Sequence, residues 1–131
     1  TIFKKNVYNG LENFSATSPY TYKIALYTAS ADLNADTLAY TTTNEVTGAG
    51  YTAGGKALTV LPTQTDSGTA FISFNNVTWA GSGFTARCAL IYNGTTNAAV
   101  AVLDFGSDKT SANFTITFPA ATSTTAIIRY S

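Results

Sequence analysis

The most chemically suggestive stretch of the sequence is the glycine-rich segment 44–58, NEVTGAGYTAGGKAL. Within it, Gly50 to Lys56 has the spacing G-x-x-x-x-G-K of a nucleotide-binding phosphate loop. In such a loop a helix follows the glycines, its free N–H groups bind phosphate, and a Ser or Thr hydroxyl binds magnesium. Here Ala57 occupies the hydroxyl position, and Pro62 closes a short β-branched run that is unsuited to that helix. The sequence therefore predicts no phosphate site.

A second pattern overlaps the first, because Gly48-x-Gly50-x-x-Ala53 imitates a dinucleotide-binding fingerprint. It lacks the same strand and helix on either side. We interpret the segment instead as a connection that crosses from one sheet to another, with glycines supplying positive φ angles and close backbone contacts.

Other groups that could do chemistry are sparse. The chain has no histidine, and Cys88 is its only cysteine, so no intrachain disulfide can form and a buried thiol is expected. The acidic pairs Asp32/Asp36 and Asp104/Asp108 lie in turn-like contexts, where Asp commonly accepts bonds from nearby backbone N–H groups. A calcium site there is the alternative, but it would need more clustered oxygens than these spacings supply.

Aromatic residues raise the question of carbohydrate binding. Trp79 and the eight tyrosines are suited to a sugar platform, but a single Trp in V-T-W-A is more typical of a sandwich core. A carbohydrate-active enzyme would need paired carboxylates facing a cleft, and the two glutamates and five aspartates offer no such pair. We therefore expect no enzyme activity and no cofactor or metal.

Composition narrows the class of protein. A chain of 131 residues fits one domain, 1–131, with residues 1–20 as an N-terminal arm or cap. Seven basic and seven acidic residues cancel, and charged residues make up only 11%, so neither nucleic acid nor an anionic membrane is an expected partner. No segment has the length of a signal peptide core or a membrane span.

Alternating apolar and β-branched residues predict seven or eight short strands. Turn signals such as Asp66-Ser67-Gly68 and Asn93-Gly94 separate them. This pattern predicts an all-β fold, an antiparallel β-sandwich of the jelly-roll or immunoglobulin-like kind. The predicted strands are Tyr22 to Tyr27, Lys56 to Leu61, Thr69 to Phe74, Val77 to Ala80, Phe84 to Tyr92, Ala98 to Phe105, Phe114 to Phe118 and Ala126 to Tyr130.

Two segments carry further expectations. Ala98 to Phe105 is apolar on both faces, so we expect it in the middle of the assembly. Only Phe3 to Phe14 has a helical pattern, and Gly10 within it makes that helix short or absent.

Several sequence blocks, in order from Tyr22 to Arg129, resemble a family of small virion structural proteins of tailed bacteriophages. The blocks are YKIALYT, TLAYTTTNEVTGAGYTAGGKALT, NNVTW, TARCALIYN, VLDFGSDK and FTITFPAATSTTAIIR. The resemblance implies a protein of the mature particle and carries no chemical activity with it.

The resemblance leaves two placements open. The first is a capsid decoration or cement protein, made in the bacterial cytoplasm, that binds the major capsid protein at capsomer junctions as a homo-oligomer, with a trimer favoured over a dimer. The alternative is a tail or neck protein or a receptor-binding β domain. Within the decoration placement, two regions are predicted to contact the capsid. They are the N-terminal segment, with Phe3, Lys4, Lys5 and Tyr8, and the glycine-rich loop, with Glu45, Tyr51 and Lys56.

Overall fold

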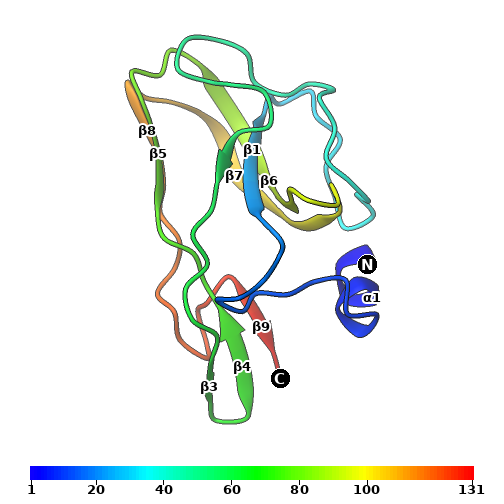
Figure 1. The fold of residues 1–131 in the computed structure, drawn as a ribbon. Helices are drawn as coiled ribbons and strands as arrows, with labels where there is room; N and C mark the ends of the chain where they lie inside the picture. The colour runs from blue at the N-terminus through cyan, green and yellow to red at the C-terminus, as the bar shows by residue number, and fades with distance from the viewer.

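The computed structural model describes all residues, 1–131, as one short helix and nine strands (Figure 1). Every strand pair is antiparallel, which confirms the predicted all-β fold. The elements are α1 Ile2–Tyr8, β1 Tyr22–Tyr27, β2 Lys56–Ala57, β3 Gln64–Asp66, β4 Thr69–Ile72, β5 Val77–Ala80, β6 Thr85–Asn93, β7 Ala99–Thr110, β8 Asn113–Ile116 and β9 Ile128–Tyr130.

The strands form two layers around one main core. The first layer is a four-stranded sheet of order β2-β1-β6-β7, and the second contains the β3-β4-β9 and β5-β8 sheets. Side chains from both layers meet in a cluster of 15 buried residues, among them Ile24 and Ile91 from the first layer and Trp79 and Phe114 from the second. Trp79 is 1% exposed, which places it in the core as predicted.

The segment after the glycine-rich loop crosses from one layer to the other. Lys56 and Ala57 pair with β1, and Leu58 N–H donates to the Tyr22 carbonyl. Only two residues later, Val60 forms a bridge with Phe74 in the second layer. The glycine-rich loop itself leaves β1 at Glu45 and returns to β1 at Lys56, so the prediction that it crosses between sheets is wrong, and the crossing lies just after it, between Leu58 and Val60.

A second, smaller cluster covers the outer face of the four-stranded sheet. Tyr27, Leu90 and Tyr92 are buried there beneath side chains of the β1–β2 loop and beneath Ile2 of α1. Because β1 and β6 are thus covered on both faces and paired on both edges, they occupy the middle of the sheet.

The prediction that Ala98 to Phe105 lies in the middle is wrong, because β7 is the edge strand of its sheet. An apolar run on both faces predicts that both faces are covered, but it says nothing about whether both edges are paired. Val100 and Leu103 pack against the main core, and Val102 packs against the outer cluster, all of them only partly buried.

Local signals predicted most of the remaining features. The helix ends at Tyr8, two residues before Gly10, which has φ +69°. Ser67 and Gly68 both have positive φ, and they join β3 to β4 in the tight hairpin turn that this chemistry favours. The β3 strand itself was missed, because Gln64–Asp66 is exposed throughout and has no apolar pattern.

Candidate functional site

The glycine-rich loop is the first candidate region, and it contains no phosphate site. Lys56 begins a strand and not a helix, so no set of free helical N–H groups faces the glycines. Gly48, Gly50, Gly54 and Gly55 all have positive φ, as the sequence predicted. The loop therefore uses its glycines to shape the backbone.

A buried carboxylate fixes this loop. Glu45 is 8% exposed, and its Oε1 accepts hydrogen bonds from the Tyr51 hydroxyl at 2.6 Å and the Gly54 N–H at 2.7 Å. Its Oε2 accepts one from the Tyr40 hydroxyl at 2.6 Å. Hydrogen bonds to a buried ionised acceptor are stronger than neutral ones, so the three donors hold the carboxylate in place.

The same cluster ties the loop to the sheet. The Tyr51 hydroxyl accepts a hydrogen bond from the Leu26 N–H of β1 at 2.9 Å, and the Tyr92 hydroxyl of β6 donates to the Gly54 carbonyl at 2.7 Å. Burial, followed by the hydrogen bond to Glu45, raises the pKa of Tyr40 and of Tyr51 well above the usual value. Both phenols are therefore proton donors to Glu45 at neutral pH.

Ionisation of Tyr92 makes the attachment of the glycine-rich loop to the sheet sensitive to alkali. Burial, then the charge of Glu45, raises the pKa of Tyr92 to about 12. An unfolded tyrosine ionises near pH 10, so above about pH 10 the unfolded chain loses this proton before the folded chain does. This contribution to the free energy of unfolding is complete below about pH 10 and falls by about 1.4 kcal/mol for each pH unit above it.

We therefore expect Tyr92→Phe to lose stability less steeply than the wild type between about pH 10 and 11. Urea unfolding at each pH measures the two slopes. Equal slopes would contradict the assignment, whereas a constant offset below pH 10 only reports the lost hydrogen bond to Gly54.

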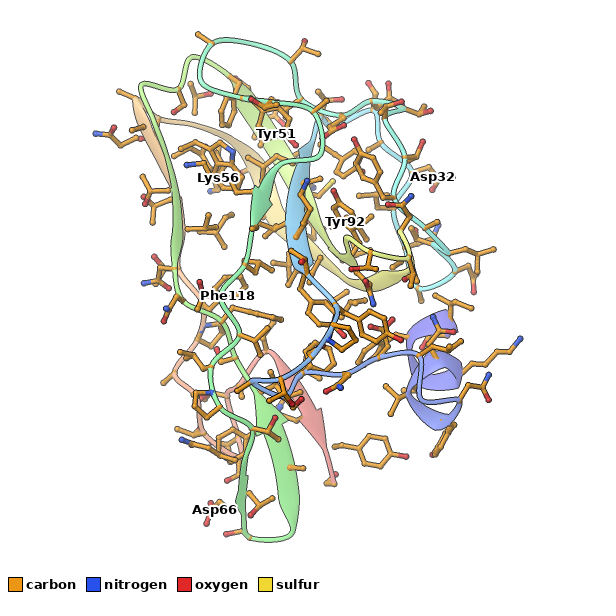
Figure 2. All side chains as sticks on the ribbon, viewed as in Figure 1. Asp32, Tyr51, Lys56, Asp66, Tyr92 and Phe118 are labelled. Carbon is orange, nitrogen blue, oxygen red and sulfur yellow. The ribbon has the colours of Figure 1, made fainter.

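The structure places the three predicted contact residues of the loop differently from one another. Glu45 is occupied inside the chain, so it would have to leave its three donors to meet a partner. The Lys56 Nζ lies between β2 and β5, donates to the Thr78 carbonyl at 2.7 Å and stands 5.9 Å from the centroid of the Trp79 ring (Figure 2). Partner contact by Tyr51 and Lys56 stays a prediction.

The second candidate region lies where α1 stands beside the β4 and β9 strands (Figure 1). Between them is a cleft of about 220 Å³, which we call the α1–β9 cleft. Its walls are mainly apolar, and they include Phe3, Val7, Phe14, Phe71, Ile128 and Tyr130.

Basic and aromatic groups surround this cleft. Lys4 and Arg129 line it, and Lys5 is exposed on the same helix. The hydroxyls of Tyr8 and Tyr130 contact each other across 122 residues of sequence. The structure thus brings the predicted N-terminal residues together with Arg129 and Tyr130, which sequence reasoning missed because nothing in the local pattern links the two ends of the chain.

The arm after α1 is held against the sandwich. Glu12 Oε2 accepts hydrogen bonds from the Tyr22 hydroxyl at 2.8 Å and the Asn93 side chain at 3.2 Å, and its Oε1 is buried without a partner. The Phe14 ring stacks on Tyr22 with centroids 4.3 Å apart. These contacts fix the position of α1 relative to β1 and β6.

Comparison with known protein families, curated proteins and solved structures gives no match. The geometry of the two regions is therefore what supports a function.

No three acidic or cysteine side chains gather as a metal-binding group, and the seven-residue helix is too short to cross a membrane. The acidic pair at Asp104 is engaged in another way, since Asp104 pairs with Arg87 and accepts from the Gly106 N–H at 2.8 Å.

Proposed function

We propose that this protein is a non-enzymatic structural component of a tailed-bacteriophage particle that decorates the outer surface of the head. In this proposal it binds the major capsid protein at capsomer junctions as a homo-oligomer and ties neighbouring capsomers together. The ordered sequence blocks from Tyr22 to Arg129 support the particle assignment.

One observation supports a binding role in particular. Four of the five exposed large apolar side chains lie at the α1–β9 end, together with Lys4, Lys5 and Arg129, which make no ion pair. The ion pair of the protein, Arg87 with Asp104, lies elsewhere. Monomeric proteins rarely leave such mixed apolar patches uncovered unless the patch binds something. The loop of Glu45, by contrast, is fixed by internal hydrogen bonds and suits a scaffold that must not deform.

Decoration needs no chemistry at the site. A small domain that touches several capsid subunits adds contacts across their junction, and linked binding events multiply individually modest affinities. A homo-oligomer strengthens this effect, because each subunit that binds raises the effective concentration of the next. The predicted result is a head that resists internal pressure and heat better with the protein than without it.

The experiment adds the purified protein to heads that were isolated without it. We expect the protein to sediment with the heads and to raise their disruption temperature. A variant lacking residues 1–10 should remain folded but stay in the supernatant. The deletion stops at residue 10 because Glu12 and Phe14 pack on Tyr22 and belong to the folded sandwich.

A count of copies in purified particles separates the two placements. A number comparable with the number of capsomers supports decoration. A far smaller number, together with binding to host cells and none to heads, would overturn it in favour of a tail or receptor-binding protein.

A further inference from the structure

Five large apolar side chains are exposed, and their positions are uneven. Val7, Tyr8, Leu11 and Tyr130 belong to α1, the turn after it, or β9. The fifth, Leu38, is 65% exposed in the loop between β1 and β2. An apolar residue that stands alone needs no explanation by itself. Leu38, however, lies next to an exposed carboxylate, and the α1–β9 cleft offers an apolar lining beside basic groups.

Leu38 stands on rigid backbone. Just before it, the turn 34–37 is closed by hydrogen bonds from Thr37 N–H to the Asn34 carbonyl at 3.1 Å and from Asn34 N–H to Thr37 Oγ1 at 2.9 Å. The Leu38 carbonyl accepts from the Ala99 N–H of β7 at 2.9 Å. A side chain held in this way loses little backbone freedom when it binds, which favours affinity.

The charges beside Leu38 and beside the α1–β9 cleft have opposite signs. Asp36, two residues before Leu38, is exposed and makes no ion pair, so this loop presents an apolar side chain next to a free carboxylate. Lys4 and Arg129 at the α1–β9 cleft also make no ion pair. The one acidic group lining the cleft, Glu12, is directed to Tyr22 and Asn93.

The α1–β9 cleft is smaller than a typical small-molecule pocket. Pockets that hold whole small molecules are usually about 300–1,000 Å³, whereas the α1–β9 cleft measures about 220 Å³. Its mainly apolar lining suits an aliphatic group, and its basic residues suit a carboxylate beside that group.

We propose that the α1–β9 cleft of one subunit binds Leu38 of a second copy of this chain, with Asp36 of that copy beside Lys4 and Arg129. This inference rests on the proposed function, in which the α1–β9 region binds other proteins, and it identifies a second copy of this chain as one of them. The contact covers exposed apolar side chains on both surfaces. It also pairs Asp36 with Lys4 and Arg129, none of which makes an ion pair within one subunit.

The two surfaces lie close together in one subunit but are not the same. Asn34, Ala35 and Thr37 line a hollow beside β7 together with the start of α1. Phe3 of α1 lines both this hollow and the α1–β9 cleft, so the two hollows lie on either side of α1. Contacts between two different surfaces form rings when the rotation between subunits closes and open filaments when it does not. We expect a closed ring, because the proposed function is that of a small homo-oligomer.

Analytical ultracentrifugation of the purified protein, without heads, tests the interface. The wild type should sediment as an oligomer, and Leu38→Ser should dissociate at least about tenfold more readily because the inserted side chain is lost. The matched variant Leu38→Met keeps an apolar side chain of similar volume and should stay oligomeric. A monomeric wild type, or equal behaviour of Leu38→Ser and Leu38→Met, would overturn the proposal.

A charge exchange tests the register of the contact. Asp36→Lys should weaken the oligomer, and combining it with Lys4→Glu and Arg129→Glu should restore it, while Asp108→Lys at the far end of β7 should change nothing. Failure of the combined variant to recover would overturn the pairing. A monomeric wild type that binds heads would rule out this interface and the homo-oligomer but would leave decoration of the head standing. An oligomer that does not bind heads would support this interface and rule out decoration.

Discussion

Replacing Gly55 by alanine is expected to lower the free energy of unfolding by more than about 4 kcal/mol, a large part of the roughly 5–15 kcal/mol that stabilises an average domain. A Cβ atom on Gly55 would overlap the Ile24 carbonyl oxygen and lie 2.7 Å from the Ile24 carbonyl carbon and 2.8 Å from the Ala25 Cα. All three atoms belong to the backbone of β1, a strand paired on both sides. Gly55 lies on the β2 side of β1, so relief would require β1 and the segment that begins β2 to move apart, which would break the β1–β2 pairing.

The matched control is Gly68→Ala in the β3–β4 turn. Gly68 has φ +79°, close to the +74° of Gly55, but a Cβ there would meet no atom within 4 Å. Alanine in this conformation costs about 1–2 kcal/mol from backbone strain alone. Soluble yield and urea unfolding of both variants isolate the effect of the close approach, and similar losses in the two would show that β1 yields more easily than its pairing indicates.

Gly55 also shows where sequence reasoning stopped. The composition of the glycine-rich segment predicted positive φ angles, which are present, and a crossing between layers, which instead lies just after the segment at Val60. Which glycine touches the backbone of β1 depends on how the loop returns to the sheet, and no spacing along the chain contains that information. The same holds for the α1–β9 cleft, whose two sides come from opposite ends of the sequence.

The strands were predictable where packing imposes a pattern. β1 and β5 have the predicted bounds, because Tyr22–Tyr27 and Val77–Ala80 have clear β-strand patterns and lie against the core. β3 has no buried residue, so nothing in its side chains marked it, and its pairing follows from the turn that joins it to β4. Position within the sheet was the weakest inference, since burial of faces and pairing of edges are separate constraints.

Removing the Glu45 carboxylate is the second change with a large expected effect. Glu45→Ala would leave the Tyr40 hydroxyl, the Tyr51 hydroxyl and the Gly54 N–H without their acceptor. Loss of one partner from a buried charged network typically costs about 3–5 kcal/mol, because each orphaned donor has already given up water. We expect a loss of that size, with the fold retained at low temperature.

Two measurements show whether that loss comes from the hydrogen bonds of Glu45 to the glycine-rich loop and not from a uniform loss of stability across the domain. Amide exchange at Gly54 should accelerate in Glu45→Ala while exchange in β6 follows global stability only. In a double-mutant cycle, Tyr40→Phe should cost less in the Glu45→Ala background than in the wild type, by about 0.5–3 kcal/mol. Tyr40 is the cleaner partner, because Tyr51 also accepts from the Leu26 N–H and its loss would leave that group unpaired. Additive effects of Glu45→Ala and Tyr40→Phe, with unchanged exchange at Gly54, would mean that the loop is held by its glycine geometry alone.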